Sequence, residues 1–230
     1  MTNGRPWNSL LIDGRILLDL PPTALIEMQR LGLDLTEIDV IFITHLHADH
    51  LFGLPFLLLE YCTRRERSRP LYVVGPSGIE LRSRTLCDLA WPGMRKAGFE
   101  PHVPISYLEV TQAGEYHAGE LAFTAVQLEH FDLTAFGYRF THREKTIAYT
   151  GDTTDCGQLG ELLDGADVAI IELTYPNATD DPGHMDAPAA AHWAKKLQAQ
   201  GTHVFATHMS ELPEPIDGLT ICEDCRTYYI

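Results

Sequence analysis

The amino-acid sequence predicts a mixed α/β fold, and the type and order of its periodic segments support this class. Short apolar or alternating segments are typical of strands, and they outnumber the segments with helical spacing. Strands follow one another directly in part of the chain and alternate with helices elsewhere, which is typical of sheets whose faces are covered by helices. The 230 residues contain no internal repeat or obvious linker, so we expect a single domain over residues 1–230.

The expected elements extend along the whole chain. Strands are expected at residues 8–12, 15–20, 39–44, 71–74, 105–110, 120–129, 136–140, 146–150, 167–173, 203–207 and 218–222. Helices are expected at about residues 22–31, 51–62, 78–89, 157–163 and 187–199. The first helix is expected to begin near Pro22 and to end at Gly32, since proline favours a first turn and glycine favours a helix end. Asp186 is expected to cap the last helix, because its carboxylate can accept from amides of the first turn.

Composition restricts the partners and the location of the chain. The net charge of −15 argues against long nucleic acid as a partner, because phosphate binding rests on Lys and Arg. No run of about eighteen apolar residues indicates a membrane span, and the first residues lack the pattern of a signal peptide, so we expect a cytoplasmic location. Five cysteines, an odd number, argue against a disulfide framework. Cys222 and Cys225 form a lone CxxC pair, which we interpret as part of a terminal strand and not as a metal site.

Four potential metal ligands follow one apolar segment. The run "VIFI" leads directly into "THLHADH", which ends at residue 50 and contains His45, His47, Asp49 and His50. His45 and His47 point the same way if the backbone is extended. Asp49 and His50 follow where the chain turns towards a helix, so we expect them to point at a neighbouring position.

Three other apolar segments end in side chains of the same kind. "TAVQLEH" ends at His130, "TIAYTGD" ends at Asp152, and "HVFATH" ends at His208. Strand ends are where α/β folds usually place their sites, so we expect the four segments to converge. Any one of these histidines alone would more often be an ordinary core or surface residue, but the combination favours a metal site.

The ligand types and their number predict two divalent ions. Imidazole and carboxylate suit zinc, manganese or iron, of which we expect zinc. Seven candidates exceed the four ligands of a closed structural zinc site. Two ions roughly 3.5–4 Å apart could share a hydroxide that acts as the nucleophile. The expected division is His45, His47 and His130 for one ion, Asp49, His50 and His208 for the other, and Asp152 as the bridge.

With these residues, the chain resembles the metallo-β-lactamase-fold metal-dependent hydrolases. "HLHADH" matches the central motif of that superfamily, and His130, Asp152 and His208 match its later ligand positions in order. The segments "DHLFGLPFLL", "HFDLTAFGYRF", "YTGDT" and "ATHMS" are most similar to its ribonuclease Z and phosphodiesterase branch. The resemblance covers about residues 8–222. It implies an αββα four-layer sandwich, in which two mixed sheets pack face to face with helices outside, and it is compatible with a homodimer.

The resemblance also implies roles for individual residues. Asp49 would bind a metal ion and accept the proton of the nucleophile. "GHMDAPAAAHWAKK" resembles the segment that supplies a proton donor, which gives this catalytic role to His184, with an ordinary loop histidine as the alternative. Asp19, in "ILLDLPP", resembles an aspartate that orients a ligand histidine through its second ring nitrogen, with a turn-forming role as the alternative.

The expected reaction is hydrolysis of a small or cyclic phosphodiester by the metal-bridging hydroxide. Residues 79–105 leave little room for the tRNA-gripping arm of many ribonuclease Z enzymes, which argues against tRNA processing. Asp152 stands where true zinc β-lactamases have a cysteine, which argues against antibiotic hydrolysis. Four alternatives remain: a thioester or lactone hydrolase of the glyoxalase II or lactonase type, ribonuclease Z-like processing of RNA 3′ ends, an iron redox protein, and a non-catalytic binding module.

Overall fold

The computed structural model describes residues 6–63, 69–93, 97 and 104–230. The chain forms two compact units, Trp7–Thr111 and Gln112–Ile230, which we call the N-terminal unit and the C-terminal unit. Each unit contains one mixed sheet with helices packed against it. The predicted mixed α/β class, with two mixed sheets flanked by helices, is therefore confirmed. A single domain over residues 1–230 remains a prediction.

The N-terminal unit is built on a five-stranded sheet. Its strands, in spatial order, are β1 (Leu10–Ile12), β2 (Ile16–Leu18), β3 (Val40–Phe42), β4 (Leu71–Pro76) and β5 (Ile105–Val110). The first two strands pair antiparallel, whereas β2, β3, β4 and β5 are parallel neighbours. The carboxyl ends of β2 and β3 therefore lie side by side, and both lead into loops that carry predicted site residues.

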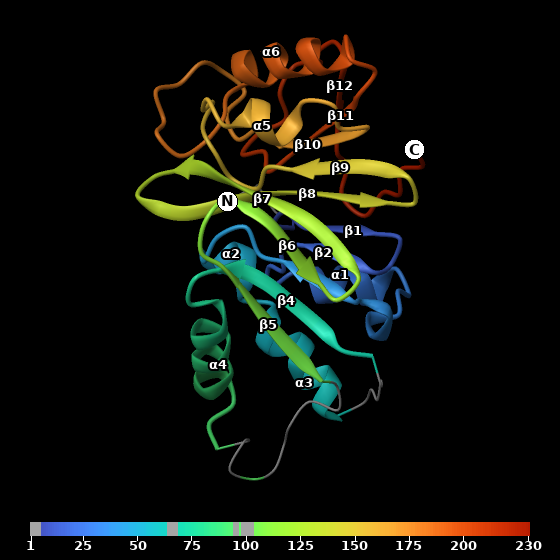
Figure 1. Ribbon diagram of the computed structural model, residues 1–230, viewed down its shortest axis with the longest axis vertical. Helices are drawn as coiled ribbons and strands as arrows, with labels where there is room; N and C mark the ends of the chain where they lie inside the picture. The colour runs from blue at the N-terminus through green and yellow to red at the C-terminus, as the bar shows by residue number, and fades with distance from the viewer. Residues whose placement is uncertain (1–5, 64–68, 94–96, 98–103) are drawn as a thin grey trace. The chain divides into compact units, whose positions relative to one another are not determined.

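Helices cover one face of this sheet. They are α1 (Ala24–Arg30), α2 (Ala48–Leu51), α3 (Leu54–Thr63) and α4 (Ile79–Ala90), with a 3₁₀ turn at Leu35–Glu37. Figure 1 shows α3 and α4 beside β4 and β5. Leu17, Ile41 and Val73 stand opposite one another on neighbouring strands and share an apolar core with Leu25 of α1 and Leu57 of α3. Burial of this face holds β3, and therefore the segment that follows it, in place.

The expected helix at residues 51–62 is wrong at its start, because the structure divides it into α2 and α3 at Gly53. A Cβ atom on this glycine would lie 2.8 Å from the carbonyl oxygen of Leu20. The Gly53 N–H donates to that carbonyl (2.9 Å), and the Leu20 N–H donates to the carbonyl of His50 (2.8 Å). These two hydrogen bonds tie the short helix carrying Asp49 and His50 to the end of β2.

Gly53→Ala is expected to lower the free energy of unfolding by about 1–3 kcal/mol, because the added methyl group forces two packed backbone segments apart. Urea unfolding of the metal-free protein, followed by circular dichroism, measures the change. Gly157→Ala is the matched control, since a Cβ atom there meets nothing within 4 Å. Equal stability of the two variants would contradict the close approach at Gly53.

The C-terminal unit is built on a seven-stranded sheet. Its strands, in spatial order, are β12 (Leu219–Ile221), β11 (His203–Thr207), β10 (Val168–Glu172), β9 (Lys145–Tyr149), β8 (Leu133–His142), β7 (Leu121–His130) and β6 (Gly114–Ala118). Strands β6 to β9 form antiparallel pairs, and β9 to β12 form parallel pairs. The carboxyl ends of β9, β10 and β11 therefore lie at one edge of this sheet.

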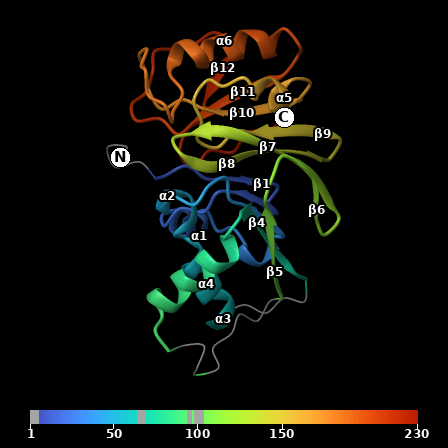
Figure 2. The ribbon, with the colours of Figure 1, turned by 60° about the vertical axis from the view of Figure 1, so that its left-hand side comes forward.

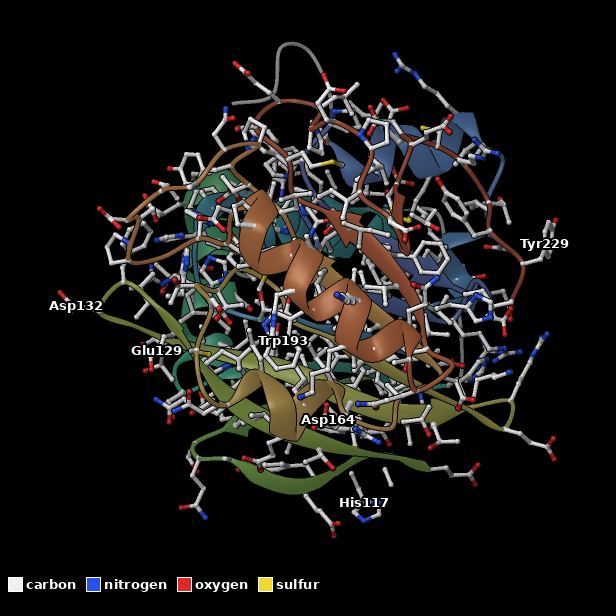
Figure 3. All side chains as sticks on the ribbon, turned by 90° about the horizontal axis from the view of Figure 1, so that it is seen from above. His117, Glu129, Asp132, Asp164, Trp193 and Tyr229 are labelled. Carbon is white, nitrogen blue, oxygen red and sulfur yellow. The ribbon has the colours of Figure 1, made fainter. Side chains whose placement is uncertain are left out.

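Two helices pack on this sheet through a shared apolar core. They are α5 (Leu159–Leu163) and α6 (Ala187–Gln198), and Figure 2 shows them beside β9, β10 and β11. Leu162 and Trp193 pack with Ala169 and Val204 of the strands. Trp193 is 7% exposed, and Figure 3 labels it beside α6. The predicted cap of α6 is confirmed, because the Asp186 carboxylate accepts from the Ala189 N–H (2.9 Å).

The strand β6 was missed by the sequence analysis. Its residues alternate between partly buried and exposed, and only Ala118 is buried. The strand lies at the edge of the sheet and pairs with β7 alone. An edge strand of this kind needs little apolar sequence, so hydrophobic periodicity does not reveal it. The strand β8 also begins at Leu133, earlier than the expected residue 136.

Among the residues that the structure describes, no helix has the length and apolar content needed to cross a membrane. The cytoplasmic location and the homodimer remain predictions. The predicted lack of room for a tRNA-gripping arm falls partly on residues 94–96 and 98–103, which lie outside the described residues, whereas α4 accounts for residues 79–90.

Candidate metal centre

Four of the seven predicted ligands belong to the N-terminal unit, and the structure brings their side chains together within that unit. The ring centroid of His45 lies 4.6 Å from that of His47 and 4.2 Å from that of His50. Nε2 of His50 lies 3.9 Å from a carboxylate oxygen of Asp49. The loop after β3 and the first turn of α2 thus concentrate three imidazoles and one carboxylate.

The buried carboxylate of Asp19 forms hydrogen bonds to this cluster. It follows β2, has a positive φ of 55° and is fully buried. One carboxylate oxygen accepts from the backbone N–H of Thr44 (2.8 Å), and the other accepts from Nδ1 of His50 (2.9 Å). Nδ1 of His45 lies 3.1 Å from the Thr44 hydroxyl, which is also bonded to Asp19. Asp19 therefore contacts His50 directly and His45 through Thr44, which is the geometry that the role of orienting ligand candidates requires.

The other three predicted ligands belong to the C-terminal unit, and they also lie near one another within it. Nε2 of His208 lies 3.2 Å from a carboxylate oxygen of Asp152. Ligand atoms of His130, Asp152 and His184 lie within 4.8 Å of one another. Nδ1 of His130 donates to the carbonyl of Gly183 (2.7 Å). The ends of β7, β9 and β11 thus deliver a second set of imidazole and carboxylate groups.

The tautomer of His208 follows from its neighbour Thr174. The Thr174 hydroxyl lies within hydrogen-bond distance of two acceptors, the Glu172 carboxylate (2.6 Å) and the carbonyl of His208 (3.0 Å). With its proton donated to either, it accepts from Nδ1 of His208 (2.8 Å). With the proton on Nδ1, Nε2 faces the carboxylate of Asp152 as a second acceptor. Two acceptors at this distance repel each other, so a metal ion bound between them would stabilise the pair.

His184 lies beside this second set. Its ring stacks on that of His208, with centroids 5.3 Å apart and planes 14° apart, and meets the ring of His130 edge-on at 4.9 Å. Nδ1 of His184 donates to the carboxylate of Glu172 (3.0 Å). Burial alone would lower the pKa of His184, but the hydrogen bond and charge of Glu172, with Asp152 and Asp181, outweigh it and raise that pKa above its ordinary value. The imidazole is therefore biased towards its protonated form.

Glu172 is a site residue that the sequence analysis missed. It ends β10 and is 1% exposed, and its carboxylate accepts from the Thr153 N–H (2.7 Å) as well as from Thr174 and His184. Burial raises its pKa, and the hydrogen bond from His184 opposes that rise. A signal was available, because "AIIE" is an apolar strand that ends in a carboxylate, like the segment ending at Asp152.

A shallow cavity of about 370 Å³ opens next to His184. Side chains that could contact a bound molecule there include Thr154, Asp155, Asp186 and His192. None of its lining residues is Lys or Arg. The described part of the chain therefore offers no lysine or arginine charge to a group bound in this cavity.

The comparisons with known proteins decide the family. A family model described as the beta-lactamase superfamily domain matches residues 14–209. The chain belongs to this superfamily. Among curated relatives in it, the ribonuclease BN of Citrobacter koseri is 37% identical over 247 residues, which cover 84% of this chain and 77% of the relative. The ribonuclease Z of Staphylococcus epidermidis is 36% identical over 49% of this chain, but the match spans only 34% of that relative's length.

The solved structure of the short form of human tRNase Z has the same fold. It matches with a TM-score of 0.73 at 22% sequence identity, over 98% of this chain and 95% of that chain. The predicted resemblance is therefore confirmed: the chain has the metallo-β-lactamase fold, belongs to this superfamily, and has ribonuclease Z and ribonuclease BN among its relatives. Since the relatives are ribonucleases, they weigh against the expectation that long nucleic acid is not a partner.

The candidate ligand side chains of both units are suited to bind divalent metal ions, which membership of this superfamily implies. Nδ1 of His50, His130 and His208 is engaged by a carboxylate, a carbonyl or a hydroxyl, which is how proteins usually orient histidine ligands so that the other nitrogen binds the metal. The clusters contain imidazoles and carboxylates, the ligand types of zinc, manganese and iron. The expectation that Cys222 and Cys225 belong to a terminal strand is wrong, because β12 ends at Ile221 and both cysteines follow it; that the pair holds no metal stays a prediction.

Proposed function

We propose that this superfamily member is a phosphodiesterase that uses two divalent metal ions, with zinc preferred and manganese or iron as alternatives. The proposed ligands are those expected from the sequence, namely His45, His47, Asp49, His50, His130, Asp152 and His208. When bound, two such ions would neutralise the charge of the phosphate and lower the pKa of the water that acts as nucleophile.

The observation that carries the proposal is the His184–Glu172 pair. Glu172 holds Nδ1 of His184 and raises its pKa, so that Nε2 carries a proton it can donate. An alkoxide leaving group requires such a proton in the transition state, whereas a thiolate leaves without one. A phosphodiester with an alkoxide leaving group therefore fits this arrangement better than a thioester.

We assign the opposite proton transfer to Asp49. Its carboxylate lies in the partly exposed first turn of α2, next to the cluster of His45, His47 and His50. A carboxylate in this position can accept the proton of an attacking water. Acid and base would thus come from different segments, with Asp49 as the acceptor and His184 as the donor.

We rank three candidate substrate classes for this chemistry. The net charge of −15 favours a small or cyclic phosphodiester over a long nucleic acid, because binding of many phosphates rests on Lys and Arg. The relative from Citrobacter koseri, named a ribonuclease, favours processing of RNA 3′ ends as the second candidate. Hydrolysis of a thioester or lactone is the third.

A paired assay on protein of known metal content tests the proposal. Zinc-loaded and manganese-loaded protein is expected to hydrolyse bis(p-nitrophenyl) phosphate, and Asp152→Ala is expected to lose this activity together with bound metal. S-lactoylglutathione and a precursor tRNA with a 3′ trailer are the comparison substrates. Activity on the thioester alone would overturn the phosphodiesterase assignment, and efficient release of the trailer would move the substrate assignment to RNA.

A further inference from the structure

The hairpin turn between β7 and β8 carries a large aromatic residue in a strained backbone conformation. His130 pairs with Leu133, so Phe131 and Asp132 alone form the turn. Phe131 has a positive φ of 49°. Two-residue hairpin turns favour Gly, Asn or Asp where φ is positive, because a larger side chain is strained there. The demands of the turn therefore do not explain a phenylalanine at this position.

The ring of Phe131 is held against the candidate metal centre of the C-terminal unit. Its centroid lies 4.8 Å from that of His130 and 5.6 Å from that of His184, which it meets edge-on at 82°. Gly183 leaves the space that the ring occupies, since a Cβ atom there would lie 2.6 Å from Cδ2 of Phe131. The carbonyl of the same glycine orients His130. The ring is thus fixed beside the histidine to which we assign proton donation.

Core packing does not explain the phenylalanine either, because Phe131 is 47% exposed. Its exposed neighbours Glu129 and Asp132 are acidic, and Figure 3 shows both at the same edge of the molecule. Acidic neighbours repel a phosphate group but tolerate a neutral flat ring. Strained residues that remain exposed at a site commonly serve its ligand.

We propose that Phe131 determines specificity by stacking the exposed part of its ring on a nucleobase of the substrate, next to the phosphodiester that is cleaved. Stacking on an aromatic ring is favourable for every base and needs no hydrogen-bond pattern. The substrate class is thereby narrowed to nucleotide diesters of any base, in preference to diesters without a base. This inference rests on the proposed phosphodiesterase function.

Binding of adenosine monophosphate and of ribose 5-phosphate to zinc-loaded protein, measured by calorimetry, tests the proposal without turnover. The wild type is expected to bind adenosine monophosphate roughly 5- to 150-fold more tightly than ribose 5-phosphate, which is the range that base stacking on an aromatic residue supports. Phe131→Leu keeps an apolar side chain but removes the aromatic face, and it is expected to abolish this preference while leaving the affinity for ribose 5-phosphate unchanged. Phe131→Tyr is expected to retain the preference.

Leu133→Ala is the matched control, because Leu133 is also apolar and exposed (40%) and lies in the same hairpin. This variant is expected to keep the preference of the wild type. A preference that persists in Phe131→Leu, or equal affinities of the wild type for the two ligands, would overturn the proposal.

A kinetic experiment separates this proposal from the proposed function. Phe131→Leu is expected to raise KM for a dinucleotide by roughly 5- to 150-fold, the factor expected for binding of adenosine monophosphate. KM for a dinucleotide that lacks the base beside the cleaved bond is expected to change little. Diester hydrolysis with equal effects on both substrates would overturn the role of Phe131 and leave the phosphodiesterase assignment intact. A base preference lost in Phe131→Leu, in a protein that hydrolyses only thioesters, would support the stacking role and overturn the phosphodiesterase assignment.

Discussion

His184→Ala is expected to lower kcat by about 10²–10⁴-fold on a phosphodiester with an alkoxide leaving group. The reason is that the alkoxide must be protonated as it departs, and the imidazole held by Glu172 is the donor beside the ligand cluster. On bis(p-nitrophenyl) phosphate the loss is expected to be much smaller, because nitrophenolate leaves without protonation. Steady-state kinetics on both substrates, at equal metal content, measures the difference.

His117→Ala is the matched control for this experiment. His117 lies on the edge strand β6 and is exposed, and Figure 3 shows it apart from the labelled Glu129 and Asp132. Its replacement is expected to leave both activities unchanged. Equal losses on the two substrates in His184→Ala would argue against proton donation and for a role in holding the neighbouring His208 and His130.

Asp19→Asn is expected to weaken binding of the divalent ion by about 10- to 100-fold, the usual effect of changing a group that orients a histidine ligand. The amide keeps the shape of the side chain and can still accept from the Thr44 N–H, but it removes the negative charge that His50 Nδ1 contacts. Competition with a chromophoric chelator measures the affinity for zinc.

Asp88→Ala, which removes an exposed carboxylate of α4, is the charge-matched control for Asp19→Asn. It is expected to keep the affinity of the wild type. An unchanged zinc affinity in Asp19→Asn, with a normal circular dichroism spectrum, would show that Asp19 serves only the turn after β2. A loss of zinc affinity without unfolding would support its role in orienting His50.

The metal-ligand candidates could be predicted from the sequence because the relevant signal is local. Each candidate stands at the end of an apolar strand, and the strands β9, β10 and β11 end at one edge because they are parallel. The cap at Asp186 is local in the same sense, since donor and acceptor are separated by three residues. Strand periodicity and residue type therefore suffice to place such groups.

Other features depend on residues that are distant along the chain, and the sequence analysis missed them for that reason. The break at Gly53 arises from its contact with the backbone around Leu20. The helical periodicity of the sequence contains no information about this contact. The role of Glu172 depends on the Thr153 amide and on His184, brought together only by the fold. The exposure of Phe131 depends on the hairpin register and on the space at Gly183.

The parallel ladder of β9, β10 and β11 has a consequence for how this protein could acquire new activities. Backbone pairing of Tyr149 with Ile170, and of Glu172 with Thr207, sets the spacing of the groups at the strand ends. Replacement of neighbouring loop side chains leaves that spacing untouched. Random mutagenesis of the β7–β8 turn and of the loop before α6 is therefore expected to yield altered substrate preferences with intact metal loading, whereas single-residue insertions in the three strands should be purged in any selection for activity.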